Sequence, residues 1–231
     1  MNTEPLISIT LPFHCKETSV TEVVAEYKKK LIEKGITFEL HIVINGCTDQ
    51  NEERIVRVLE ESPRIVEYRL RESGWGRGVL CGLREARGTF VCYTNTARTK
   101  IDDLLKFIDY ATIDPRAVVK ATRVVRESAL RKWVSIFYNL ENRIILKTPI
   151  WDINATPKII PYDLLARLNL QSLDDLIDAE LMFKCFNFGI PVVEVPVVNV
   201  LKRRSGRSTT NILSAFKMWL GVFKIRWLYG K

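Results

Sequence analysis

Short apolar segments alternate with amphipathic helical segments along the first half of the chain, and this alternation restricts the fold more than any other feature. Strands are predicted at residues 6–13, 38–44, 64–70 and 89–94. Helices are predicted at residues 19–34, 52–61, 76–87 and 102–111. Strands joined by such helices form a mostly parallel sheet with helices on both faces, and ligands bind at the carboxyl ends of its strands. The sequence therefore predicts an α/β fold with its function in the loops after Leu11, Ile44, Leu70 and Tyr93.

The second half of the chain loses this regular alternation. Strands are predicted at residues 117–122 and 192–200, and helices at residues 130–146, 162–168 and 175–188. No linker, internal repeat or low-complexity tract separates the two halves, and 231 residues suit one compact α/β domain. We therefore expect a single domain at residues 1–208 with a central sheet flanked by helices, followed by an amphipathic helix at residues 209–231.

An excess of basic residues indicates the kind of partner. Lys and Arg number 35 against 27 Asp and Glu, which gives a formal net charge of +8. Such a charge attracts phosphate-bearing partners, which include nucleotides, lipid phosphates, anionic membranes and nucleic acids. No recognition helix or RNA-binding motif accompanies the charge, so nucleic acid ranks last and is not predicted as a partner.

Cysteine usage and hydropathy indicate the compartment. The five cysteines form no CxxC pair and no pairing with histidine, so neither a zinc site nor a disulfide framework is predicted. Residues 1–13 lack the basic start and the cleavage site of a signal peptide, and Lys217, Lys224 and Arg226 interrupt the apolar segment 212–229. The predicted location is the reducing cytoplasm, with the protein either soluble or peripheral on the cytoplasmic face of a membrane.

Several motifs lie in the predicted loops and turns. Residues 11–17 read LPFHCKE, residues 45–49 read NGCTD and residues 74–88 read GWGRGVLCGLREARG. In this order they resemble the I-P-A-Y-N-E-E, D-G-S-T-D and N-x-G-x-G-x-A-x-x-x-G-x-x-x-A-x-G motifs of the family 2 glycosyltransferases, particularly the polyprenyl-phosphate and dolichyl-phosphate sugar transferase branch. Further family counterparts lie at residues 152–158, 178–181, 193–197 and 203–208. The resemblance spans residues 6–208, and its strength lies in the ordered set of motifs.

The resemblance implies a glycosyltransferase A-type, Rossmann-like domain that moves a sugar from a nucleotide-diphosphate sugar to a polyprenyl phosphate or a membrane-associated glycan. The implied donor-binding residues are Pro12, His14, Lys16, Glu17, Asn45, Gly46, Asp49, Gly76, Arg77, Thr94, Thr96 and Arg98. A guanidinium group can donate two hydrogen bonds to the oxygens of one phosphate. The implied acceptor-phosphate residues are Arg123, Arg131, Arg203, Arg204 and Arg207. The carboxylates implied for catalysis, as a base or in orienting the acceptor, are Asp152, Asp178 and Glu180.

The sequence departs from the family at the metal site. The family carries a D-x-D or A-D motif at the end of the fourth strand that holds a divalent metal against the donor diphosphate, whereas this chain has Thr94 and Thr96 there. Hydroxyls are poor ligands for a hard cation, so no cofactor is predicted with certainty. Binding of Mg²⁺ or Mn²⁺ stays open as an alternative, although the usual ligands are absent. Our hypothesis is that Lys16, Arg77 and Arg98 supply the positive charge that the leaving diphosphate needs.

These assignments have simpler alternatives. A glycine-rich turn such as that at residues 74–78 is equally typical of an ordinary strand-to-helix connection. Asp178 and Glu180 could lie on a solvated helix face together with Asp174 and Asp175. Loss of the acids could also mean that the site has decayed, which would leave a catalytically inactive binding or scaffold domain of the same fold.

The C-terminal helix carries an apolar stripe. Its members are Ile212, Leu213, Phe216, Trp219, Leu220, Phe223 and Trp227. Trp, Phe and Leu opposite lysines such as Lys217 and Lys224 are typical of a helix that lies in a membrane interface. Packing of the stripe on the protein's own core or on a partner is the alternative, and Trp133, Phe137 and Trp151 could extend either surface.

Overall fold

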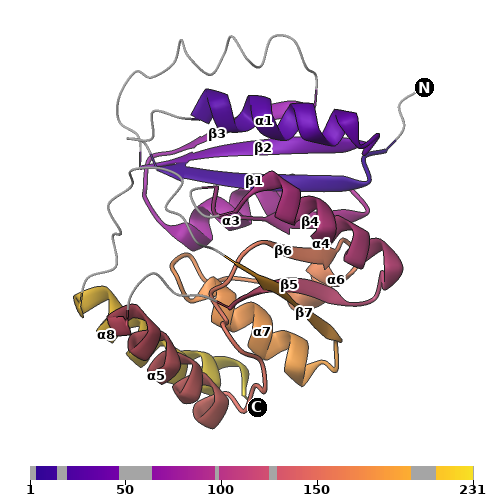
Figure 1. Cartoon of the computed structure of the whole chain (residues 1–231). Helices are drawn as coiled ribbons and strands as arrows, with labels where there is room; N and C mark the ends of the chain where they lie inside the picture. Colours follow the sequence, from indigo (N-terminus) through magenta and orange to yellow (C-terminus); the bar gives the residue numbers. More distant parts are fainter. Residues whose placement is uncertain are drawn as a thin grey trace.

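The computed structural model describes residues 4–14, 20–46, 64–96, 99–124, 129–198 and 212–230. Within these residues seven strands form one sheet in the order β3-β2-β1-β4-β6-β5-β7 (Figure 1). Neighbouring strands are parallel except where β6 pairs antiparallel with β4 and β5. The predicted α/β fold with a mostly parallel sheet is therefore confirmed.

The predicted elements agree well with the observed ones. The strands are β1 Ile7–His14, β2 Phe38–Asn45, β3 Ile65–Leu70, β4 Phe90–Tyr93, β5 Val118–Arg123, β6 Lys158–Pro161 and β7 Val192–Val197. The helices are α1 Val20–Glu33, α3 Trp75–Arg84, α4 Ile101–Ile113, α5 Ala129–Ile145, α6 Leu164–Leu168, α7 Ile177–Asn187 and α8 Ile212–Tyr229. The helix predicted at residues 52–61 lies outside the described residues.

The sequence does not predict β6. Its four residues, KIIP, are too few to show a strand pattern, and Pro161 weakens the signal further. β6 nevertheless pairs with two strands, and its first residue, Lys158, lies opposite Tyr93, the last residue of β4. The antiparallel direction therefore places Lys158 at the edge of the sheet where β4 ends.

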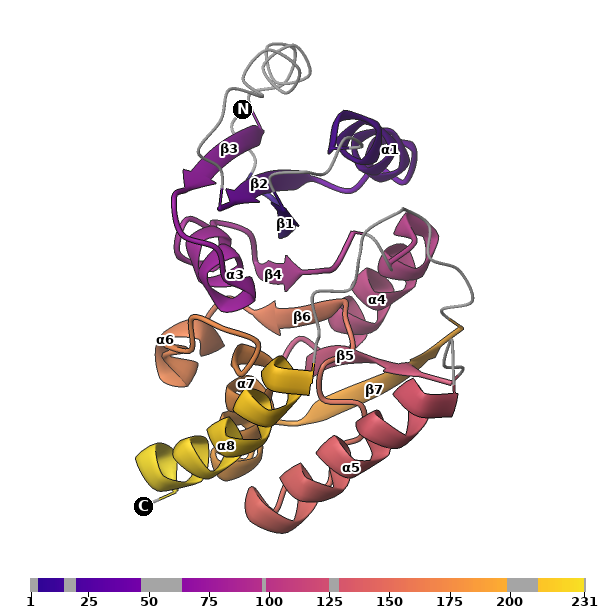
Figure 2. The ribbon, with the colours of Figure 1, turned by 90° about the vertical axis from the view of Figure 1, so that its left-hand side faces the viewer.

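Helices cover both faces of the sheet. α1 and α4 lie on one face, and α3, α6 and α7 lie on the other (Figure 2). Alternate residues of β4 divide in the same way, since Phe90 and Cys92 belong to the core beside α1 and α4, whereas Val91 and Tyr93 belong to the core beside α3 and α7. A separate hydrophobic core on each face fixes the register of the central strands.

α5 and α8 lie side by side at one end of the molecule (Figures 1 and 2). One side of α8 packs on the domain, because Val222 and Ile225 are buried and a Cβ at Gly221 would lie 2.6 Å from Leu176 Cδ2. The opposite side exposes Phe223 and Trp227. The side of α8 that packs on the core is therefore not the predicted stripe, because Trp219, Leu220, Phe223 and Trp227, the stripe members with described side chains, are all exposed.

Glu39, near the start of β2, connects the amino edge of the sheet to the segment that follows α3. Its Oε1 atom accepts hydrogen bonds from the Ser8 hydroxyl at 2.6 Å and the Arg87 backbone N–H at 2.7 Å, and His41 Nε2 lies 3.5 Å away. Burial raises the pKa of this carboxyl group, but the contacts with His41, Ser8 and Arg87 outweigh it and lower the pKa from 4.5 to about 2.

We expect Glu39→Gln to lower the free energy of unfolding by about 2 kcal/mol at pH 7, somewhat less than the pKa shift corresponds to, because solvent screens part of the effect. The carboxylate stabilises the fold fully above pH 4.5, and this contribution is lost as the pH falls toward 2. Urea unfolding at pH 7 and pH 3 measures the change. The deficit of the variant should shrink at pH 3, and an unchanged deficit would contradict the assignment.

Candidate functional site

The ends of β1, β2 and β3 lie level with one another at one edge of the sheet. His14, the last residue of β1, is in register with Asn45, the last residue of β2, and Asn45 is in register with Leu70 of β3. Gly46 follows with a φ of 68°, and its N–H donates to the Leu70 carbonyl oxygen at 2.9 Å. The predicted donor residues on β1 and β2 therefore lie together at the carboxyl edge.

The first turn of α3 lies against these strand ends. A Cβ on Gly78 would lie 3.1 Å from Pro12 Cβ and would overlap the side-chain amide of Asn45, so only glycine allows this approach. Asn45 is 6% exposed, and its Oδ1 atom has no hydrogen-bond partner within the described part of the chain. This buried oxygen is available to accept a hydrogen bond from a ligand.

The end of β4 presents hydroxyl groups where the family has carboxylates. Thr94 and Thr96 are buried, and the Thr94 hydroxyl donates to Thr99 Oγ1 at 2.6 Å. Across residues 4–14, 20–46, 64–96, 99–124, 129–198 and 212–230 no group of three or more His, Cys, Asp or Glu side chains could hold a metal ion. The donor set at the end of β4 does not fit Mg²⁺ or Mn²⁺, which take carboxylate oxygens.

Asp178, in the first turn of α7, is 3% exposed and forms part of a buried polar cluster. Its Oδ1 atom accepts a hydrogen bond from the Tyr93 hydroxyl at 2.8 Å and forms an ion pair with Lys158, and its Oδ2 atom accepts from Trp75 Nε1 at 3.2 Å. Glu180 is fully buried. The alternative that Asp178 and Glu180 lie on a solvated helix face is therefore wrong, because both carboxylates point into the protein.

Asp152 is held by Arg123 at the end of β5. The carboxylate accepts hydrogen bonds from the Arg123 backbone N–H at 2.9 Å, from Nε at 2.7 Å and from Nη2 at 2.5 Å. Asp152 has a φ of 47° and is 4% exposed. This contact places the Arg123 guanidinium, and it uses two of the N–H groups that the resemblance implied for an acceptor phosphate.

A row of charged side chains crosses the sheet on the α7 face. Lys158 lies in register with Lys120 of β5, and both are fully buried. Lys120 Nζ donates to Glu194 Oε1 at 2.9 Å and to the Trp151 carbonyl oxygen at 2.6 Å. Burial lowers the pKa of Lys120 to about 8, against the upward effect of Glu194, and burial also lowers the pKa of Lys158.

The sequence reasoning did not single out Lys120, Lys158 or Tyr93. A lysine within the apolar stretches AVVKAT and KIIP is the signal that it could have used, since lysine is rarely buried without a partner. The strand order, and β6 in particular, brings these side chains together.

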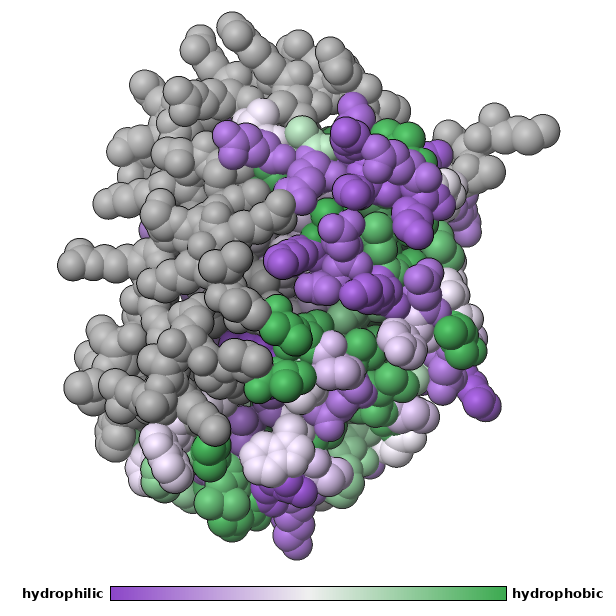
Figure 3. Space-filling view, viewed as in Figure 1, coloured by the Kyte–Doolittle hydropathy of each residue, from purple (hydrophilic) through white to green (hydrophobic). Residues whose placement is uncertain are grey.

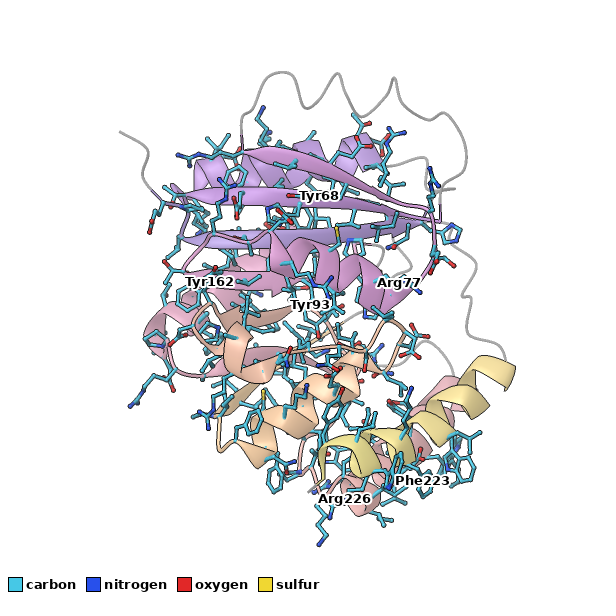
Figure 4. The ribbon with its side chains drawn as sticks, turned by 180° about the vertical axis from the view of Figure 1, so that it is seen from behind. Tyr68, Arg77, Tyr93, Tyr162, Phe223 and Arg226 are labelled. Carbon is cyan, nitrogen blue, oxygen red and sulfur yellow. The ribbon has the colours of Figure 1, made fainter. Side chains whose placement is uncertain are left out.

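Arg77 lies in the first turn of α3, near the carboxyl ends of the strands, and Tyr93 lies beneath that helix (Figure 4). The Arg77 side chain is 37% exposed, and its guanidinium pairs with Glu72 at 2.5 Å. The other predicted residues Lys16, Glu17, Asp49, Arg98, Arg203, Arg204 and Arg207 lie outside the described residues, as does the side chain of Arg131.

The sequence matches a known family and a curated relative. The Glycosyl transferase family 2 model matches residues 8–168. An undecaprenyl-phosphate 4-deoxy-4-formamido-L-arabinose transferase from Pseudomonas aeruginosa is 24% identical over 140 residues, which cover 58% of this chain and 41% of the transferase. The chain therefore spans less than half of that relative's length.

Crystal structures of glucosyl-3-phosphoglycerate synthase from Mycobacterium tuberculosis have a similar fold. The complex with Mn²⁺, uridine diphosphate and phosphoglyceric acid has a TM-score of 0.70 at 15% identity, covering 96% of this chain and 77% of the synthase. The complex with Mg²⁺ and uridine diphosphate has a TM-score of 0.68 at 16% identity, covering 96% and 78%. At these identities the likeness concerns the fold.

Proposed function

This chain belongs to glycosyl transferase family 2 and has the glycosyltransferase A-type fold, and on that basis we propose that it moves a sugar from a nucleotide-diphosphate sugar to an acceptor. The observation that supports this most directly is the Oδ1 atom of Asn45, which is buried at the end of β2 beside Gly78 and has no hydrogen-bond partner among the described residues. A buried acceptor without a partner is costly unless a ligand supplies a donor, and a nucleoside N–H or hydroxyl is such a donor.

We propose that Lys16, Arg77 and Arg98 replace the metal at the diphosphate. As the acceptor oxygen forms its bond to the sugar, the bond from the sugar to the diphosphate breaks, and the diphosphate leaves with the bonding electrons. Fixed cations at the carboxyl edge of the sheet would stabilise the negative charge that develops on the diphosphate. The buried hydroxyls of Thr94 and Thr96, and the exposed guanidinium of Arg77 at the carboxyl edge, support this proposal.

The proposed acceptor is a polyprenyl phosphate. A phosphate oxygen is already anionic and needs no general base. This agrees with the paired state of the three candidate carboxylates, since Asp152, Asp178 and Glu180 each contact a Lys or Arg side chain. In this proposal Asp152 holds the positive charge of Arg123 in place for the acceptor.

Peripheral contact with a membrane is supported by the outer side of the α5–α8 pair. Its exposed apolar residues are Trp133, Phe137, Leu140 and Ile144 of α5 and Trp219, Leu220, Phe223, Trp227 and Leu228 of α8. The surface over α1, at the opposite end of the molecule, is mostly hydrophilic (Figure 3). An exposed patch with Trp, Phe and Leu suits a membrane interface. None of the helices in the described ranges has the length and apolar character needed to span a bilayer.

Transfer activity should persist when divalent metals are removed, because the proposed charge at the diphosphate comes from side chains. The assay follows labelled sugar from a nucleotide-diphosphate sugar into polyprenyl phosphate, with and without excess EDTA, after thermal-shift screening identifies the donor. Equal rates are expected. Loss of the activity in EDTA and its recovery with Mg²⁺ or Mn²⁺ would refute the metal-independent site and leave the transferase assignment intact.

A non-catalytic nucleotide-sugar-binding domain is the second candidate. The observation that favours it is the same pairing of all three carboxylates, which leaves none of them as an unpaired base. The two candidates differ in one measurement. A domain that is stabilised by a nucleotide sugar but neither transfers nor hydrolyses the sugar would be a binding domain.

A further inference from the structure

The loop between α6 and α7, residues 169–176, lies directly against the first turn of α3, and we call this loop the strap. The Leu173 carbonyl oxygen accepts a hydrogen bond from the Arg77 backbone N–H at 3.0 Å. A Cβ on Gly76 would overlap the Ser172 carbonyl oxygen and lie 2.7 Å from that of Asp174. The strap and the turn at residues 74–78 therefore meet backbone to backbone, so the position of one determines the position of the other.

Glu180 holds the strap from behind. Its carboxylate accepts hydrogen bonds from the Gln171 N–H at 3.0 and 3.1 Å and from the Ser172 N–H at 2.7 Å. Lys184 Nζ donates to Glu180 Oε1 at 2.5 Å and also to the Asn169 carbonyl oxygen at 2.7 Å. The Lys184 Nζ atom also lies 4.1 Å from the centroid of the Tyr229 ring of α8. A fully buried carboxylate with this set of donors is suited to fixing a loop rather than to taking a proton from a substrate.

We propose that Glu180 is a positioning residue for the nucleotide-sugar donor, which it does not touch. It fixes residues 171 and 172 of the strap, and the strap fixes the turn that carries Gly76 and Arg77. We call residues 74–78 the donor turn. The Glu180 carboxylate therefore fixes the shape of the donor turn indirectly, because it holds the strap and the strap holds the turn. This inference rests on the proposed function of the turn in donor binding.

Glu180→Gln tests the inference with little change in shape. The glutamine keeps one acceptor oxygen but presents an NH₂ group toward the strap N–H groups or Lys184, so one set of contacts is lost. Glu39→Gln is the matched control, because the Glu39 carboxylate also accepts a hydrogen bond from a backbone N–H, that of Arg87 near the other end of α3. Both variants should be less stable, and only Glu180→Gln should affect the donor turn.

The first readout needs no nucleotide. Amide hydrogen exchange at Arg77 should become about tenfold faster in Glu180→Gln and stay unchanged in Glu39→Gln. Faster exchange at Gln171 and Ser172 with unchanged exchange at Arg77 would overturn the proposal, because the strap would then loosen without affecting the turn. If Glu180→Gln does not fold, Gly76→Ala separates the same two segments from the opposite side, and it should give the same change at Arg77.

The second readout separates positioning from catalysis. Uridine, guanosine, adenosine, cytidine and thymidine diphosphates are screened on the wild type, and the Kd of the nucleotide that binds should rise about tenfold in Glu180→Gln. In the transfer assay KM for the donor should rise while kcat stays within about threefold, whereas loss of a general base lowers kcat by about 10²–10⁴-fold. A fall in kcat at constant KM would overturn the inference. Failure of every nucleotide to bind the wild type would contradict the proposed function, and the exchange result at Arg77 would still decide the coupling.

Discussion

Arg77→Gln is expected to lower kcat/KM for sugar transfer by about 10²–10³-fold, the loss that follows removal of one preorganised charge at a developing anion. The Arg77 side chain is 37% exposed, so the variant should fold normally. Arg77→Lys keeps the charge but not the planar fork, and it should recover part of the lost activity. Initial rates at several donor concentrations measure the effect.

Arg84→Gln is the control for this result, because it makes the same substitution on the same helix at an exposed position in the last turn. Its activity should match the wild type. If Arg77→Gln retains activity within about threefold of the wild type, the proposed role of Arg77 at the diphosphate is wrong.

Lys158→Met is expected to produce the largest loss of stability, about 3–5 kcal/mol in the free energy of unfolding, because it leaves the buried Asp178 carboxylate without a basic partner. The Tyr93 and Trp75 hydrogen bonds to Asp178 remain, but neither neutralises its charge. Urea unfolding at neutral pH measures the loss.

Lys120→Met is the matched control for Lys158→Met. The two lysines are neighbours in register and equally buried, but the side chain of Glu194, the partner of Lys120, is 31% exposed, whereas that of Asp178 is 5% exposed. Water can hydrate Glu194 once Lys120 is gone, so Lys120→Met should lower the free energy of unfolding clearly less than Lys158→Met does. The double variant Lys158→Met/Asp178→Asn should recover part of the stability, and equal losses in the two single variants would contradict this explanation.

The sequence predicts most strands and helices and the mostly parallel character of the sheet, because hydrophobic periodicity is a local signal. The strand patterns end close to His14 and Asn45, which the structure places in register, and close to Tyr93, which is in register with Thr10. The parallel topology follows from the alternation of strands and helices, so it needs no knowledge of individual contacts.

Most partners of the carboxylates cannot be predicted in this way. Asp178 is bound by Lys158 and by Trp75, which lie 20 and 103 residues away in the chain. In the sequence Asp178 and Glu180 look like polar residues in the first turn of a helix, which is usually solvated. The Lys184 partner of Glu180 lies four residues further along the same helix and is a local signal. The other contacts come from β6, α3 and the strap, and local pattern carries no information on them. The roles of Lys16 and Arg98 stay predictions.

The position of α8 has a consequence for how such a transferase would operate. Gly221 lies on Leu176 of the strap, and the Tyr229 ring lies beside Lys184, the partner of Glu180. The far side of the helix exposes Phe223 and Trp227. A lipid bilayer that pressed on this helix would push on the strap, which supports the proposed donor turn. Binding to the membrane would then promote binding of the nucleotide sugar, so that the donor binds only where a lipid acceptor is within reach.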